Sequence, residues 1–145
     1  MSTEENKAVL RRLFDEFYNM GNMAVADEIM ASSIVIHDAS APELRGDPAL
    51  AKQRHQAQLT ATPDFHITLE DTVAEGDKIA YRWTMRGTQT GPMRGIPPTG
   101  RSFAMTGMSV VRFVDGKMAE VWHNYDALGM LQQLGLIPPA GQGKS

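Results

Sequence analysis

The chain contains no cysteine, which excludes disulfides, thiolate metal ligands and cysteine nucleophiles. It has no apolar run approaching the roughly 20 residues that a transmembrane helix needs, and its polar, acidic start lacks the basic and apolar regions of a signal peptide. Its 14 Lys and Arg residues are interleaved with 17 Asp and Glu residues, so no basic cluster is available for a phosphate backbone. We therefore expect a cytoplasmic protein that binds neither nucleic acid nor membranes, and whose chemistry comes from His, Asp, Glu, Tyr, Ser, Thr or Lys.

The 145 residues are enough for one domain with its own hydrophobic core. We expect this domain to span residues 1–137 and residues 138–145 to form a flexible tail. Ser2 and Glu5 have the spacing of a capping box, and the helical periodicity that follows predicts a first helix ending near Gly21. Asn22 begins a shorter predicted helix that ends near Met30. A strand is predicted over residues 33–38 and a third helix over residues 48–60.

The second half of the chain has the two-residue period of β-strands. Apolar residues alternate with polar ones from Phe65 to Asp126 and predict four consecutive strands. Residues 75–78 and Asp115-Gly116 are hairpin turns, residues 91–100 form a longer loop, and a short helix follows Asp126. Three helices against one face of a mainly antiparallel, curved sheet make an α+β fold, a cone whose mouth suits a small apolar ligand.

The closing strand, residues 116–126, concentrates the polar and aromatic groups of the chain. If Asp115-Gly116 closes a two-residue turn and pairing continues without interruption, Phe113 faces Met118 and Ser109 faces Trp122. One bulge would exchange the two faces of this strand. The uninterrupted register places Glu120, Trp122, Asn124 and Asp126 in the cone and turns Ala119, Val121, His123 and Tyr125 away from it.

Candidate catalytic residues follow from this register. Removal of a proton next to a carbonyl needs a base, for which Asp126 is the first candidate and Glu120 the second. Asp126 also precedes the last helix, so it is equally suited to capping that helix. His37, at the exit of its strand, is a candidate for donating to a substrate oxygen or carrying a proton.

The remaining candidates are groups suited to contact a substrate. The histidine spacing matches no metal-binding pattern, so we expect no metal site. Aromatic residues on the first helix and on the strand around residue 83 are suited equally to a core or a pocket. The predicted substrate-binding residues are Trp83, Trp122, Asn124, Tyr18, Phe14, Met105 and Ser109.

Several short stretches along nearly the whole chain occur in the order of a known family. They are IHD at 36–38, TPDF at 62–65, AEGDKIA at 74–80, RWTMRGT at 82–88, GIPPTG at 95–100, DGKM at 115–118, WHNYD at 122–126 and GMLQQLG at 129–135. In these stretches the chain resembles the SnoaL-like polyketide cyclases of the nuclear-transport-factor and ketosteroid-isomerase superfamily.

The resemblance implies a curved sheet, a cone-shaped cavity, homodimers formed through the sheet, and no metal or organic cofactor. Many of these relatives carry His in the segment that here reads 87–91, and Asp where this chain has Ser109. Both departures remove polar groups from a cavity and weigh against a straightforward cyclase.

Two functions remain open at the level of sequence. One is a cofactor-independent aldol cyclase or isomerase that acts on an apolar carbonyl compound through a carboxylate base. The other is a module of the same fold that binds a small ligand or dimerises without catalysis. An epoxide hydrolase would need an Asp-Arg-Asp group inside the cone, which the sequence does not assemble.

Overall fold

A curved sheet forms the centre of the computed structural model, which describes residues 2–38 and 43–138. In these residues the sheet has six strands in the order β2-β1-β6-β5-β4-β3. Neighbouring strands are antiparallel except β1 and β6, which run parallel. The strands are β1 (Met30–Asp38), β2 (Leu44–Gly46), β3 (His66–Glu75), β4 (Lys78–Thr88), β5 (Ser102–Val114) and β6 (Lys117–Tyr125).

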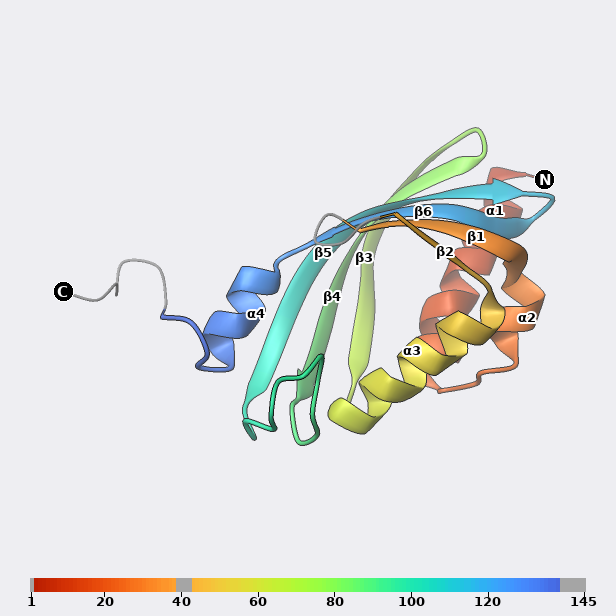
Figure 1. The fold of residues 1–145 in the computed structure, drawn as a ribbon. Helices are drawn as coiled ribbons and strands as arrows, with labels where there is room; N and C mark the ends of the chain where they lie inside the picture. The colour runs from red at the N-terminus through yellow and green to blue at the C-terminus, as the bar shows by residue number, and fades with distance from the viewer. Residues whose placement is uncertain (1, 39–42, 139–145) are drawn as a thin grey trace.

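Helices cover one face of this sheet, as Figure 1 shows. The first helix begins at a capping box in which Ser2 and Glu5 bond to each other's backbone, and after one α-helical segment it continues as a π-helix. A short helix α4 lies at the opposite end, beside β5 (Figure 1). The helices are α1 (Thr3–Arg12), the π-helical η1 (Leu13–Asn19), α2 (Val25–Ile29), α3 (Pro48–Ala61) and α4 (Ala127–Gln133).

The core lies between the helices and the concave face of the sheet. Phe14 packs edge to face against Tyr81 of β4, with ring centroids 5.8 Å apart. Phe14 and Phe17 are almost completely buried, as is Ile79 on the same face of β4 as Tyr81. Burial of a large apolar side chain of this kind contributes roughly 1.5–3 kcal/mol, so this interface holds the helices inside the cone.

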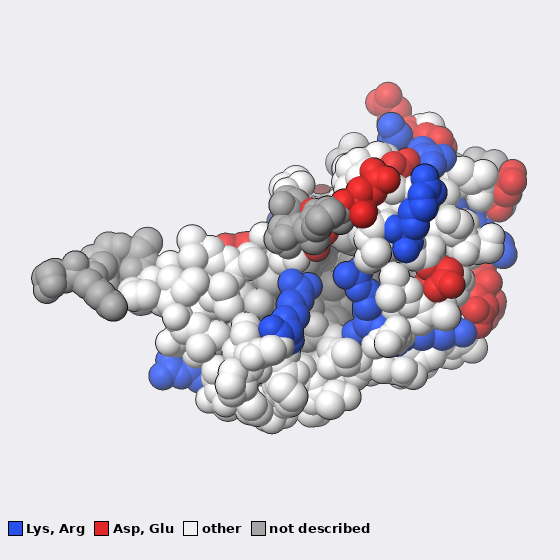
Figure 2. All heavy atoms as spheres, viewed as in Figure 1, with Lys and Arg blue, Asp and Glu red and all other residues white. Residues whose placement is uncertain are grey.

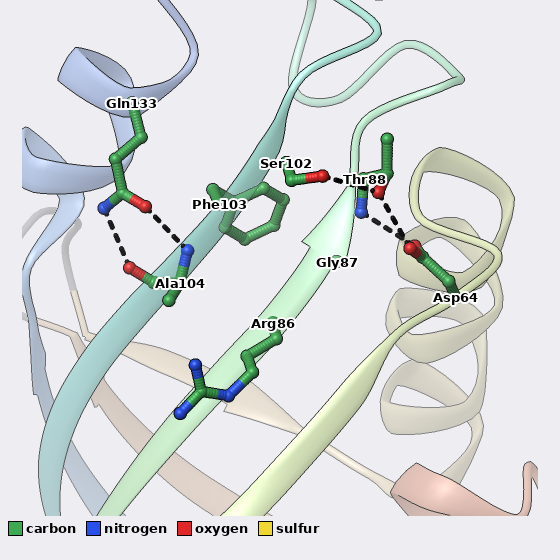
Figure 3. Close-up of a pocket in the computed structure, with 8 residues that line it drawn as sticks. All are labelled: Asp64, Arg86, Gly87, Thr88, Ser102, Phe103, Ala104 and Gln133. Carbon is green, nitrogen blue, oxygen red and sulfur yellow. Dashed lines mark hydrogen bonds between the residues drawn. The ribbon is translucent and has the colours of Figure 1, made fainter.

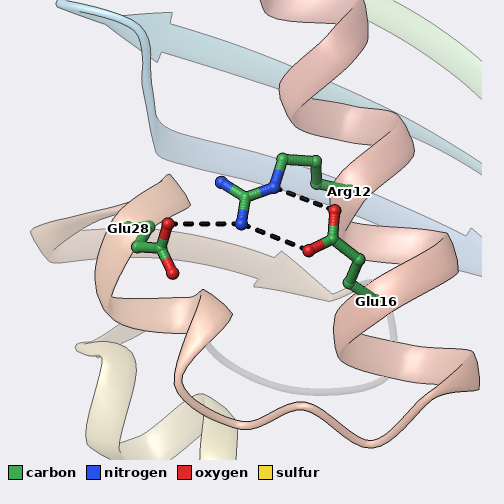
Figure 4. A network of polar contacts seen from close by, with 3 residues as sticks. All are labelled: Arg12, Glu16 and Glu28. Carbon is green, nitrogen blue, oxygen red and sulfur yellow. Dashed lines mark hydrogen bonds and ion pairs between the residues drawn. The ribbon is translucent and has the colours of Figure 1, made fainter.

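Polar contacts fix the positions of the first helices. Arg12 donates to Glu16 (2.9 Å from Nε) and to Glu28 (3.2 Å from Nη2), which links α1 and η1 to α2 (Figure 4). At the end of η1, Asn19 accepts from the backbone N–H of Ile67 and donates to its carbonyl oxygen, both at 2.8 Å. The side chain of Asn19 therefore acts as an extra backbone partner for β3.

The predicted α+β fold is confirmed, with its three N-terminal helices, curved sheet and short C-terminal helix. The turn at Asp115 and Gly116 has positive φ at both residues (51° and 77°), as a type I′ turn requires. Strand β2 and the parallel pairing of β1 with β6 were not predicted. Residues 139–145, which make up most of the predicted tail, lie outside the described residues.

The predicted register of the closing hairpin is wrong beyond its first two pairs. Phe113 does face Met118, but the next pair is Arg112 with Glu120, so Ala119 is an extra residue in β6. This β-bulge exchanges the two faces of the strand. Ser109 consequently faces His123 instead of Trp122.

Candidate functional site

A chain of hydrogen bonds crosses the concave face of the sheet from β4 to β6. The indole Nε1 of Trp83 donates to Ser109 Oγ at 3.0 Å, and the same oxygen lies 2.7 Å from Nδ1 of His123. Trp83 and Ser109 are buried, and His123 is partly buried. Three strands therefore hold one imidazole in a fixed position.

The hydrogen-bond partners favour one form of His123. An indole N–H only donates, so Ser109 accepts from Trp83 and has its own proton available for Nδ1 of His123. The neutral ring then carries its proton on Nε2. Burial lowers the pKa of His123, the nearby Asp38 carboxylate raises it, and Arg54 lowers it, with a net decrease. The ring is thus neutral at pH 7 and suited to donate a hydrogen bond from Nε2.

A carboxylate lies next to this imidazole on the parallel strand. Asp38 is the partner of His123 in the β1–β6 pairing and lies on the same face. The hydroxyl of Tyr125 donates to Asp38 Oδ2 at 2.9 Å, and Arg94 Nη1 donates to the Tyr125 hydroxyl at 3.3 Å. The group brings together a carboxylate, an imidazole, a phenol and a guanidinium from β1, β6 and the loop between β4 and β5.

Two tyrosines, the partly buried Tyr18 and the buried Tyr81, add hydroxyl groups to the interior. Burial raises the pKa of Tyr18 to about 12, against an opposing influence of Arg54. Burial raises the pKa of Tyr81 still more strongly, and Tyr18 adds to that increase. Both hydroxyls are therefore protonated at neutral pH and available as donors.

The loop of residues 91–100 is held in place by Gln89. This side chain is fully buried; its Oε1 accepts from the Thr99 hydroxyl at 2.8 Å, and its Nε2 donates to the carbonyl of Pro97 at 3.2 Å. At the start of the loop, Gly91 donates to the carbonyl of Ala61 in α3. A Cβ at Gly91 would lie 2.6 Å from the carbonyl oxygen of Thr60, so only glycine fits this approach.

Asp126, the predicted base, is not in the cone. Its side chain is exposed and its Oδ1 accepts from the backbone N–H of Gly129 at 2.8 Å, which caps α4. The prediction that Asp126 faces the cavity is wrong for two reasons. The bulge changed the register of β6, and the carboxylate accepts a hydrogen bond at the start of α4. Asp126 therefore supplies no base to the interior.

The other predicted residues of the closing strand and β1 form a cluster on the convex face. His37 stacks on Trp122 (5.2 Å, 10°), and its Nε2 lies 2.7 Å from Glu120 Oε2. Arg112 donates to the second oxygen of Glu120 at 3.1 Å. Asn124 is exposed and on the same face. The placement of Glu120, Trp122 and Asn124 in the cone is thus wrong, and His37, a predicted catalytic residue, lies with them on the convex face.

The predicted binding residues on other elements do lie on the concave side. Phe14 and Tyr18 pack there from the helices, and Trp83, Met105 and Ser109 lie there on β4 and β5. His55 of α3 is buried and bonds through Nε2 to the Tyr18 carbonyl oxygen at 2.9 Å.

His123, Asp38, Tyr125, Arg54 and Arg94 were missed as site residues. The hairpin pattern alone signals no bulge, so His123 and Tyr125 were assigned to the outer face. A usable signal existed in the alternation of Ile34, Ile36 and Asp38, which places Asp38 on the buried face of its strand.

A separate pocket of about 410 Å³ lies at the ends of β4 and β5, beside α4. Figure 3 shows Arg86 and Asp64 on its walls, with Gln133 bonded to both backbone groups of Ala104. Arg86 is exposed on the convex face, because side chains alternate along β4 and those of Tyr81, Trp83 and Met85 are buried in the core. This pocket is therefore distinct from the group around His123.

Two further structural features bear on function. Among residues 2–38 and 43–138, no three His, Asp or Glu side chains are arranged to hold a metal ion. In the same part of the chain, no helix has the length and apolar character needed to cross a membrane.

The protein has a cone-shaped α+β fold in which a small polar group, including Ser109, His123 and Asp38, lies on the otherwise apolar concave face of the sheet. The chain belongs to the SnoaL-like polyketide cyclase family, whose model matches residues 8–134.

The proteins that are similar to this chain have names that indicate different reactions. Aklanonic acid methyl ester cyclase DnrD of Streptomyces peucetius is 29% identical over 102 residues, which cover 70% of each protein. IdmH of Streptomyces antibioticus, a proposed polyketide cyclase, is 32% identical, with a TM-score of 0.77 over 90% of this chain and 98% of its own. AclR of Streptomyces galilaeus, a proposed hydroxylase, is 26% identical, with a TM-score of 0.82 over 97% of this chain and 87% of its own.

Proposed function

We propose that this protein is a cofactor-independent cyclase or isomerase that binds a small apolar carbonyl compound inside the cone. The observation that supports this most directly is the pairing of Asp38 with His123 on the concave face. One residue is a carboxylate and the other a neutral imidazole, which are the two groups that enolate chemistry needs.

The proposed reaction begins with Asp38 as the base. Its carboxylate removes a proton next to a substrate carbonyl; the C–H bond breaks and its electron pair becomes the enolate. The Nε2–H of His123 donates to the developing oxyanion, because Nδ1 is already occupied by Ser109. Trp83 and Ser109 are positioning residues, since they act through the imidazole.

The second step consumes the enolate and restores the base. In an aldol cyclisation the enolate carbon attacks a second carbonyl of the same molecule, a C–C bond forms, and the new alkoxide takes the proton from Asp38. In an isomerisation the same proton returns to another carbon. Both sequences balance without an added oxidant, reductant or metal ion.

Deuterium exchange tests the chemistry without requiring the natural substrate. We expect the protein to catalyse exchange of the acidic C–H of 2-tetralone in D2O, and we expect aklanonic acid methyl ester to be a candidate for cyclisation because a relative acts on it by name. Asp38→Asn should slow exchange by about 10²-fold or more while 2-tetralone still binds. An unchanged exchange rate in Asp38→Asn would contradict the assignment of Asp38 as the base.

The alternative is a non-catalytic binding module of the same fold. It is favoured by Ser109, which replaces the acid of many relatives, and by Gln89, whose polar groups are occupied by the loop. Tight binding of 2-tetralone with no exchange above the buffer rate would select this alternative.

A homodimer through the convex face of the sheet stays a prediction. Val73 and Met108 are 70% and 61% exposed on that face, next to the Arg82–Asp71 ion pair. Light scattering should give twice the monomer mass, and Met108→Glu should shift it toward the monomer because a charge would be buried.

A further inference from the structure

We propose that two arginines at the mouth of the cone, Arg54 and Arg94, bind an anionic group of the ligand, so that the ligand is an apolar carbonyl compound with a carboxylate. This inference rests on the proposed ligand cavity but not on catalysis. It assigns specificity to two residues outside the Asp38–His123 pair.

Arg94 is held at the tip of a two-residue turn that does not favour arginine. Met93 and Ile96 exchange both backbone hydrogen bonds (3.0 and 2.8 Å), and φ is 50° at Arg94 and 79° at Gly95. These are the dihedrals of a type I′ turn, whose first position prefers Asn, Asp or Gly. An arginine with positive φ is an outlier, and such outliers concentrate at ligand-binding sites.

The structure supporting this turn directs Arg94 toward the interior group. Gln89 fixes the far end of the loop, Met93 is buried, and Arg94 Nη1 reaches the hydroxyl of Tyr125 at 3.3 Å. Tyr125 in turn bonds Asp38. The guanidinium of the exposed Arg94 therefore reaches the Tyr125 hydroxyl, which in turn contacts the proposed base.

Arg54 is an exposed residue of α3, next in sequence to His55, which is buried and bonds to the carbonyl oxygen of Tyr18. The charge of Arg54 acts to lower the pKa of both Tyr18 on η1 and His123 on β6. Figure 2 shows a hollow between α3 and the loop that follows β4, with Lys or Arg side chains on both of its sides. The two arginines thus lie on two separate elements, α3 and the loop that follows β4.

Arg54 and Arg94 are positively charged residues that could bind an anion. Among the ion pairs formed by the described residues, none involves Arg54 or Arg94. Both guanidiniums are therefore outside the ion pairs that the described residues form. A carboxylate on the ligand would receive charge-assisted hydrogen bonds from planar donors.

A matched pair of probes tests the charge alone. Isothermal titration with 2-naphthoate and with methyl 2-naphthoate compares an acid with its neutral ester on the same ring system. The wild-type protein should bind the acid more tightly, and the preference should decrease as ionic strength rises.

The turn offers a variant that removes the charge without disturbing the backbone. Arg94→Asn supplies the residue that a type I′ turn prefers, so the loop keeps its shape. We expect Arg94→Asn and Arg54→Ala each to weaken binding of the acid by about tenfold, the scale of one charge-assisted hydrogen bond, with the ester changed by less than about twofold. Arg86→Ala, which removes an exposed guanidinium from the convex face, should change neither affinity.

The outcomes separate this inference from the proposed function. Equal affinity for acid and ester in the wild type, or an acid preference that survives in Arg54→Ala/Arg94→Asn, would overturn the anion site and leave the cavity intact. Failure of both probes to bind would count against the cavity and hence against the anion site as well. Loss of exchange activity in Asp38→Asn leaves the acid preference as a separate measurement.

Discussion

Ser109 Oγ and His123 Nδ1 lie 2.7 Å apart across β5 and β6, and this contact exists because Ala119 is an extra residue in β6. With an uninterrupted register, Ser109 would instead face Trp122. A single bulge therefore decides which polar groups enter the cone.

The first prediction concerns this contact. Ser109→Ala removes the acceptor of Trp83 and the partner of His123, leaving a buried indole N–H unpaired. We expect a loss of about 1–3 kcal/mol in the free energy of unfolding, measured by urea denaturation. We also expect a lower kcat for exchange with little change in KM, because His123 loses its orientation. Ser109→Thr, which keeps the hydroxyl, should recover part of that kcat.

The second prediction concerns the close approach of Gly107 to the indole of Trp83. A Cβ at Gly107 would lie 2.2 Å from Cζ2 of Trp83. Gly107→Ala should therefore displace the indole, break its bond to Ser109 and destabilise the fold by about 1–3 kcal/mol. The shift should appear in tryptophan fluorescence. Unchanged fluorescence and stability would show that the sheet accommodates the methyl group.

The third prediction separates capping from catalysis at Asp126. Because its carboxylate caps α4, Asp126→Ala should cost about 1 kcal/mol of stability, whereas Asp126→Asn, which retains a good cap, should cost much less. Neither variant should reduce the exchange rate per folded molecule. A large loss of exchange rate in Asp126→Asn with normal stability would instead show that Asp126 takes part in catalysis.

The fourth prediction concerns Gln89. Replacement by alanine leaves the buried partners of its amide without bonds, so we expect a loss of about 2 kcal/mol or more. Amide exchange should accelerate mainly in residues 91–100, since Gln89 holds that loop. Thr99→Val removes only one of these bonds and should give a smaller effect in the same residues.

The fifth prediction concerns pH and two histidines, the buried His55 and the partly buried His123. Burial lowers the pKa of both His55 and His123 below the usual 6.5, so below that pH the unfolded chain takes up protons that the folded chain does not. Stability should therefore be independent of these groups above pH 6.5 and fall as pH decreases through 6.5 toward their folded pKa values. Urea denaturation at a series of pH values should show this slope, and His123→Gln should reduce it.

At lower pH, Glu120 adds a separate contribution. The hydrogen bond from His37 holds the pKa of Glu120 below 4.5, and Arg112 acts in the same direction. The stability that Glu120 contributes to the folded state is fully present above pH 4.5 and is lost as pH falls through the pKa that Glu120 has in the folded protein. Glu120→Gln should remove only this acidic part of the profile.

The amino-acid sequence by itself determined the local elements. Helical spacing around Phe14 and Phe17, the capping box at Ser2, and the Asp115-Gly116 turn each depend on neighbours within a few residues, and each was predicted correctly. The family resemblance likewise rested on short stretches of sequence and is confirmed by the match over residues 8–134.

Only the tertiary structure decided which groups share the interior. Asp38 and His123 are far apart in the chain and meet because β1 runs parallel to β6. The face on which His123 lies depends on one unpaired residue, Ala119, since side chains alternate with a period of two and a shift of one exchanges them all. Local pattern fixes the strands, but only pairing between distant strands fixes their register and so the site.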